Sequence, residues 1–218
     1  MATNISEFSK RVQPEVMGCP RVMVDRAVID AAIMFCEDTL VLERAFEHDV
    51  VIADVDTADN NAVTVDISDY SITEKPLSIV EFRIDGGKWE VSHLELQNDL
   101  DDISEIAIID TKFFSFPSDT DIKFLDIEAR DQRFFIKLAV CPLITMATID
   151  DFVFRRWHSA IEAYAKYLLM KMPEKEWTNY ELARFNLSIY NDGMARAKIV
   201  KDRGFVKGSQ RVKSVRFF

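Results

Sequence analysis

The strongest constraint on the fold is a change of hydrophobic period along the chain. Residues 19–38 and 148–202 carry apolar side chains at spacings of three and four, the period of an amphipathic α-helix. Residues 44–145 consist instead of short β-branched and aromatic runs separated by turn residues. A helical period at both ends and a strand-like middle predict an α+β fold, in which a β-rich insertion interrupts a helical unit.

The first helix is expected to begin at Cys19–Pro20, because proline suits the first helical position, and to end near Asp38. Residues 1–17 hold only scattered apolar side chains around Pro14, so we expect them to be irregular. The apolar side chains that recur at helical spacing in the first helix are Val24, Val28, Ala31, Ala32 and Phe35.

Two more helices are expected after the β-rich segment. Thr148 should cap the first of them, and Pro173 should stop it. Thr178–Glu181 has the form of a capping box for a helix over about 179–202, and Gly204 fits the position after that helix. The buried face of the first is expected to hold Phe154, Trp157, Ile161, Tyr164 and Leu168, and the second has Leu182, Phe185, Ile189 and Ala197 on one face.

The β-rich segment should form several short antiparallel strands, arranged as a small sandwich or a curled sheet. Asp85–Gly87 is a hairpin signal, because glycine reaches positive φ without strain, and Asp59–Asn61 is a second turn. The expected strands are 49–55, 62–67, 77–84, 88–96, 105–110, 121–127 and 133–140.

These elements predict three parts. Residues 1–43 and 146–204 form a helical bundle domain, whose antiparallel three-helix core joins the N-terminal helix to the C-terminal helical hairpin, because the first helix cannot be stable alone. Residues 44–145 form the β-rich insertion domain. Residues 205–218 form an extended basic C-terminal tail, since they carry no helical stripe.

Charge is divided unevenly along the chain. The net charge is −10, yet residues 198–218 carry seven bases against one acid. A body this acidic should not coat itself with DNA, because it repels phosphates. A basic tail on an acidic body is typical of a segment that binds an acidic partner, although a solvated tail that binds nothing has the same composition.

Several classes of protein are excluded by what the sequence lacks. No apolar run approaches the roughly 18 residues that cross a bilayer, and the N-terminus has no apolar signal-peptide core, so we expect no membrane association and synthesis in a cytoplasm. The three cysteines, Cys19, Cys36 and Cys141, are too few and too far apart for a disulfide framework or a zinc site.

No catalytic, cofactor or metal site is predicted. Neither glycine-rich nucleotide loop occurs. His93 and Glu95 alternate on an expected strand but lack further ligands, and Asp54–Asp59 lacks the glycine and the later glutamate of a calcium loop. His158 is expected to be a surface or hydrogen-bonded helix histidine, and Cys19 an inert buried thiol.

Two segments resemble the head-to-tail connector, or adaptor, proteins of tailed bacteriophages. Residues 14–39 are similar to the opening of those proteins, in which Gly18–Pro20 enters a helix that ends in Phe35, Cys36, Glu37 and Thr39. Residues 138–198 are similar to the closing helical hairpin of the family, and residues 79–96 more weakly resemble its β-hairpin. The features shared with the hairpin are Pro142, Thr148–Asp151, Ala160–Leu169, Pro173, Trp177, Leu182–Ala183 and Gly193–Ala197.

The resemblance implies a non-enzymatic virion protein of the phage neck. It would form a ring, commonly of twelve copies, beneath the portal protein, extend the DNA channel, and offer a docking surface for tail or nozzle proteins. Double-stranded DNA would pass through without specific binding. The family has no catalytic residues to carry over, and by analogy the C-terminal tail would bind the portal through Lys207, Arg211, Lys213, Arg216, Phe217 and Phe218.

An alternative from another class is a carbohydrate- or calcium-binding β module carried on a helical anchor. Its motivation is the acidic, turn-rich insertion with Trp89. A hydrolase that uses scattered carboxylates is a third, weaker hypothesis, because no nucleophile and base are positioned for it.

Overall fold

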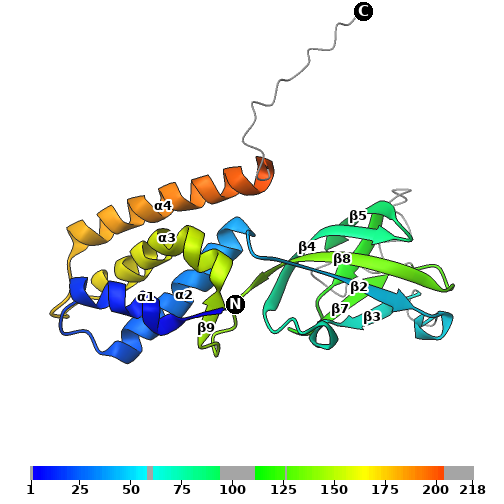
Figure 1. Cartoon of the computed structure of the whole chain (residues 1–218), viewed down its shortest axis with the longest axis horizontal. Coiled ribbons are helices and arrows are strands. Elements are labelled where there is room, and N and C mark those ends of the chain that lie inside the picture. Colours follow the sequence, from blue (N-terminus) through cyan, green and yellow to red (C-terminus); the bar gives the residue numbers. More distant parts are fainter. Residues whose placement is uncertain (1, 58–60, 94–110, 126, 204–218) are drawn as a thin grey trace, which may run out of the picture.

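The computed structural model describes residues 2–57, 61–93, 111–125 and 127–203, and it confirms the α+β class (Figure 1). Its α-helices in this part of the chain are α1 (Ile5–Val12), α2 (Arg21–Thr39), α3 (Asp151–Met170) and α4 (Tyr180–Arg203). Its strands are β1 (Ala2–Asn4), β2 (Glu43–Val50), β3 (Val63–Asp66), β4 (Lys75–Ile84), β5 (Gly87–His93), β6 (Thr111–Ser115), β7 (Asp121–Leu125), β8 (Gln132–Cys141) and β9 (Thr148–Asp150). The helices lie on one side of the molecule and β2–β8 on the other (Figure 1).

The expected start and end of α2 are confirmed within about one residue. Pro20 is its N-cap, and the five side chains expected on its apolar face are buried. The helix ends at Leu40, which adopts a left-handed φ of 50° and donates its backbone N–H to the carbonyl of Cys36. A leucine gives no sequence signal for such a helix end, which normally favours glycine.

The expected caps of α3 and α4 were wrong by one or two residues. Asp150, not Thr148, caps α3 by accepting from the Phe152 N–H, while Thr148 lies in β9. Asn179 accepts from the Leu182 N–H at the start of α4, while Thr178 closes the preceding turn. Asp and Asn cap as well as Thr does, so neighbouring candidates compete for the role. Gly204 lies outside the described residues.

The prediction that residues 1–17 are irregular was wrong. β1 pairs antiparallel with β9, and Asn4 caps α1 by accepting from the Ser6 N–H. Phe8 and Val12 are fully buried, and the Phe8 ring meets the Phe154 ring of α3 edge-on at 4.9 Å. A helix of eight residues holds too few repeats of the apolar period to stand out in sequence.

The strands β2–β8 form a seven-stranded sheet in the order β2-β8-β4-β5-β6-β7-β3. The hairpin at Asp85–Gly87 is confirmed, because it joins β4 to β5 with positive φ at Asp85 and Gly86. The expected strand 49–55 was misplaced, since β2 ends at Val50 and a 3₁₀ turn follows. The expected strand 105–110 and most of the turn at 59–61 lie outside the described residues.

One pairing departs from the expected antiparallel pattern. β5 and β6 run parallel, from Glu90 beside Thr111 to His93 beside Phe114. Parallel neighbours need a crossover of a dozen or more residues, and residues 94–110 separate these two strands. No feature of the sequence indicated a parallel pair of strands.

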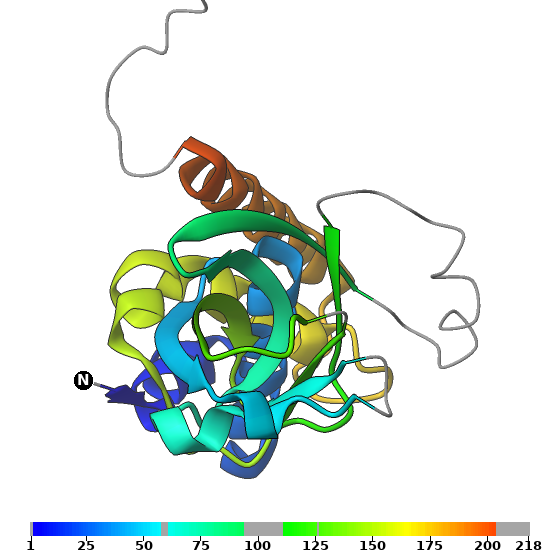
Figure 2. The same cartoon turned by 90° about the vertical axis from the view of Figure 1, so that its right-hand side faces the viewer.

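The sheet curls back on itself, which is one of the two arrangements expected from the sequence. Phe82 of β4 stacks on Phe124 of β7 at 4.7 Å, although β5 and β6 separate these strands in the sheet order. Phe134 of β8 meets both rings at 5.1 and 5.5 Å. Seen from the β side, the strands curve round instead of lying flat (Figure 2). The three fully buried rings therefore fill the inside of the curl.

α2 leads into the strands and α3 leads out of them, so these helices are antiparallel (Figure 1). α4 returns along α3, and its end comes close to the residues that follow α2 and precede α3. α2 and α4 therefore run in the same direction. Phe35 of α2 contacts Trp157 of α3 and Tyr190 of α4, with ring centroids 5.8 and 6.2 Å apart.

The face of α4 that is buried differs from the face expected from the sequence. Of the four residues expected together, only Ala197 is buried, whereas Leu182 and Phe185 are 46% and 63% exposed. The buried side of α4 consists of Ala183, Asn186, Tyr190 and Ala197. α4 carries two overlapping apolar stripes, and the stripe with Ala183 and Tyr190 is buried in place of the stripe with Leu182 and Phe185.

The closest approach lies at Gly193 of α4. A Cβ atom added there would stand 2.5 Å from the Cβ of Ala160 in α3, which is far inside van der Waals contact. Glycine inside a helix normally costs about 0.5–1 kcal/mol relative to alanine. Here the absence of a side chain is what lets the two helices pack.

Gly193→Ala should therefore destabilise the protein by about 1–3 kcal/mol, against the usual helix preference. Ala160→Gly combined with Gly193→Ala should recover most of that loss, because the two positions exchange their methyl group. Urea unfolding of the two single variants and the double variant measures this coupling. A stabilised Gly193→Ala protein would contradict the packing.

Candidate interaction surfaces

The junction between helices and strands is held by a partly buried ion cluster. Arg44 of β2 donates through Nη2 to Asp150 at 2.8 Å and also to Glu74, the residue before β4. The Arg44 and Asp150 side chains are 30% and 23% exposed. One guanidinium thus links β2, the start of α3 and the start of β4, and fixes where the chain enters and leaves the β-rich part.

A cavity of about 400 Å³ opens beside this cluster. Its walls come from the link between α2 and β2, from the start of α3 and from the end of α4, including Arg44, Trp157 and Lys201. The Trp157 indole is buried as expected, and its Nε1 finds no hydrogen-bond partner among the described residues. α4 ends at Arg203, and Val200 and Lys201 near its end line this cavity.

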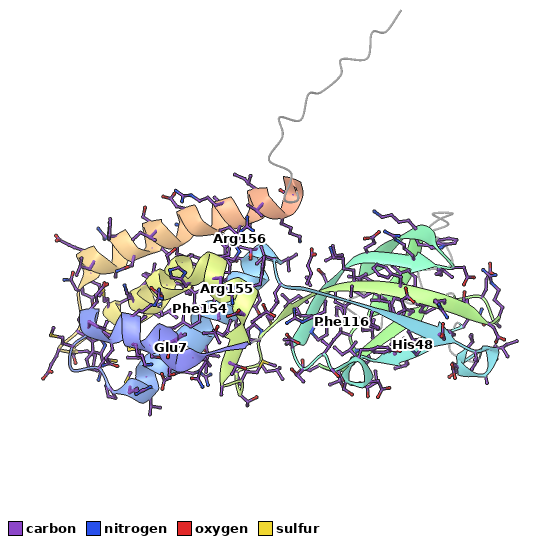
Figure 3. The ribbon with its side chains drawn as sticks, in the orientation of Figure 1. Glu7, His48, Phe116, Phe154, Arg155 and Arg156 are labelled. Carbon is purple, nitrogen blue, oxygen red and sulfur yellow. The ribbon has the colours of Figure 1, made fainter. Side chains whose placement is uncertain are left out.

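The three histidines lie in different elements of the fold. His48 lies among the strands (Figure 3), where burial lowers the pKa of its imidazole and raises that of the Tyr70 hydroxyl. The Tyr70 hydroxyl and His48 Nδ1 form a hydrogen bond with a separation of 2.6 Å. His158 is half-buried on α3, with Nδ1 3.1 Å from the Phe154 carbonyl, which agrees with the expected helix histidine. His93 lies in β5, but its side chain is outside the described set.

The three cysteines are buried free thiols. Burial raises the pKa of Cys19 at the start of α2, which agrees with the expected inert thiol. Burial also raises the pKa of Cys36 and raises that of Cys141 to about 11. None of these groups is an activated nucleophile, because the thiolate form is disfavoured at each position.

The predicted tail residues, from Lys207 to Phe218, all lie outside the described residues.

Within the described ranges, no group of three His, Cys, Asp or Glu side chains is placed to hold a metal ion. In the same ranges, no helix is long and apolar enough to cross a membrane. The aspartates at 99, 101 and 102 are also outside the described part, while Asp54 accepts from the Val51 N–H in a turn.

Sequence reasoning missed the buried carboxylate of Glu162. It lies on α3 facing α1, 8% exposed, with Oε1 3.6 Å from a nitrogen of Arg11. Oε1 is too far from Arg11 for a hydrogen bond and finds no other partner among the described residues. Burial raises the pKa of this carboxyl. The burial of this glutamate could not be predicted from the sequence, because helix α1, which covers it, was itself not predicted.

Comparison with known proteins gave no match, either to a family model or to a curated protein. The function is therefore inferred from the structure and from the resemblance of residues 14–39 and 138–198.

Asp150 has two separable roles, as an ion-pair partner and as a helix cap. Asp150→Asn should keep the hydrogen bond from the Phe152 N–H but lose the charge opposite Arg44, at a cost of about 1–2 kcal/mol. Asp150→Ala should cost about 1 kcal/mol more, because the cap is lost too. Chemical unfolding of both variants tests this; equal losses would show that the cap contributes nothing.

Replacing Glu162 should change the stability of the protein in a pH-dependent way. Its pKa is higher in the folded than in the unfolded chain, so its contribution is favourable below the unfolded pKa of about 4.3 and is lost as pH rises through the folded pKa. Glu162→Gln should therefore stabilise the protein at pH 7.5 by about 0.5–1 kcal/mol and do little near pH 4. Unfolding curves at both pH values measure this. A loss of stability at pH 7.5 would mean that the Arg11 pair outweighs burial.

Proposed function

We propose that this chain is a head-to-tail connector of a tailed bacteriophage, a non-enzymatic ring protein of the virion neck. The observation that carries the proposal is the adjacency of the two resembling segments. Residues 14–39 and 138–198 come from opposite parts of the chain, yet α2 packs against α3 and α4 around Phe35, Trp157 and Tyr190. The residues similar to the family thus belong to one packed unit.

In this proposal, α2, α3 and α4 form the antiparallel core, and α1 is added across α2 and α3. Residues 1–43 and 146–204 act as the helical domain, and residues 44–145 as the β-rich insertion domain. The pairing of β1 with β9 supports this division, since it joins the start of the chain to the residues that enter α3. The insertion would offer its surface to tail or nozzle proteins.

The charge distribution suits a channel through which DNA slides. Outside residues 198–218, acids outnumber bases by 36 to 20. A surface of this sign repels phosphates, whereas a basic lumen would bind them and slow the genome. The copy number expected from the family resemblance is twelve.

The basic tail would attach the ring to the portal protein. Arg211–Phe218 alternates basic and apolar side chains and ends in two phenylalanines, a pattern suited to adding a strand to an exposed sheet edge or to placing an aromatic anchor in a pocket. The tail follows α4 in the sequence, and the end of α4 lies beside the junction of helices and strands.

Removal of residues 205–218 should leave the melting temperature unchanged and abolish binding to the portal protein of the same virus. Co-sedimentation of portal with the full and the shortened chain measures this. Phe217→Ser/Phe218→Ser keeps the charge of the tail and should weaken binding at every salt concentration, because it removes only the aromatic anchor. Full binding by the shortened chain would contradict the role of the tail, and the absence of portal binding by the full chain would contradict the connector function.

A further inference from the structure

The exposed side of α4 has the pattern of a helix-pairing surface. Its residues recur at alternating spacings of three and four, which is the a/d period of a coiled coil. This outer seam of α4 consists of Leu182, Phe185, Ile189, Asp192, Arg196 and Ile199. All six are exposed except Ile189, which is half-buried.

The charged side chains of α4 form no ion pair within the part of the chain that the structure describes. Between Glu181 and Asp202, no acid or base of α4 forms an ion pair with any described residue. The other helices differ, since Lys10 pairs with Glu7 on α1, and Lys166 of α3 pairs with Glu15. An apolar seam with unpaired charges beside it is typical of a surface that another chain covers.

A matching surface lies on α2. A groove of about 580 Å³ runs between the first half of α2 and the end of α3, lined by apolar side chains such as Val22, Leu168 and Met172. Val22 is 79% exposed. The seam of α2 that borders this groove repeats at the same three–four spacing and consists of Met23, Arg26, Asp30 and Ile33.

The two seams are complementary in one register. Asp192 and Arg196 have the same spacing as Arg26 and Asp30 but the opposite order of charge. When α4 lies parallel to α2, the four residues of the α2 seam each face a matching residue of α4, apolar with apolar and acid with base. The facing pairs are Ile189 with Met23, Asp192 with Arg26, Arg196 with Asp30, and Ile199 with Ile33. The antiparallel arrangement would place arginine beside arginine and aspartate beside aspartate.

We propose that the outer seam of α4 in one copy docks on the α2 seam and groove of a second copy, in this parallel register. Leu182 and Phe185 then extend beyond Arg21, the first residue of α2. The two surfaces use different residues, so the contact is heterologous and repeats from copy to copy, closing a ring when the rotation allows. Because α2 and α4 already run in one direction within the chain, neighbours related by a small rotation keep them parallel. The proposal rests on the self-assembly that the connector function requires.

Mixed cross-linking tests the contact. One chain carries Ile189→Cys and the other Met23→Cys, and mild oxidation should give a disulfide-linked dimer only when both are mixed. Asn191→Cys, exposed on another side of α4, replaces Ile189→Cys as the matched control and should give none. The native cysteines are buried and are present in all samples. A dimer formed by Ile189→Cys alone, or equal yields with the control, would overturn the proposed contact.

Charge exchange tests the register. Asp192→Arg should raise the concentration of half-assembly by roughly tenfold, because it faces Arg26. Arg26→Asp combined with Asp192→Arg should restore assembly, while Asp202→Arg, an equal charge change away from the seam, should have little effect. If Asp192→Arg leaves the concentration of half-assembly unchanged, the proposed register is wrong, but the proposed connector function is not contradicted. A parent chain that stays monomeric at every concentration would count against both.

Discussion

The close approach of α3 and α4 at Ala160 and Gly193 is the constraint on which the rest of the structure depends. Because these residues bring almost no side chain to the contact, α4 turns its small residues toward α3. Tyr190 then reaches α2, where its hydroxyl donates to Asp38 at 2.6 Å. The larger apolar side chains of α4, Leu182 and Phe185, are left on the outside. The same packing that completes the helical unit therefore creates the surface available to a neighbour.

The sequence predicted best where one period was sustained over many residues. α2, α3 and α4 were located within a few residues, and the hairpin at Asp85–Gly87 followed from its glycines. Prediction failed for α1, which is too short to show a period, and for the parallel pair β5–β6, which depends on a crossover. It also chose the wrong face of α4, because Leu182 and Phe185 form as regular a stripe as Ala183 and Tyr190. Periodicity identifies apolar faces, but it does not say whether the same chain or another one covers them.

Among the candidate functional residues, the structure describes the cysteines and two of the histidines, whereas the predicted tail residues lie outside the described part of the chain. His48 and His158 lie in different elements and form separate hydrogen bonds, and the three cysteines are buried free thiols. The junction around Arg44 was not foreseen, because its partners Glu74 and Asp150 are distant in sequence and meet Arg44 only in the folded chain, where β2 and β4 both pair with β8. Together, the helical unit, the junction and the two seams make a building block with distinct surfaces, which is what the proposed connector needs.

The measurement that tests this account most directly is electron microscopy of the purified full-length chain over a range of concentrations. The account predicts closed rings with a central channel, in which helices of adjacent copies touch along α2 and α4. Isolated subunits at every concentration, or rings joined only through the strands, would contradict it.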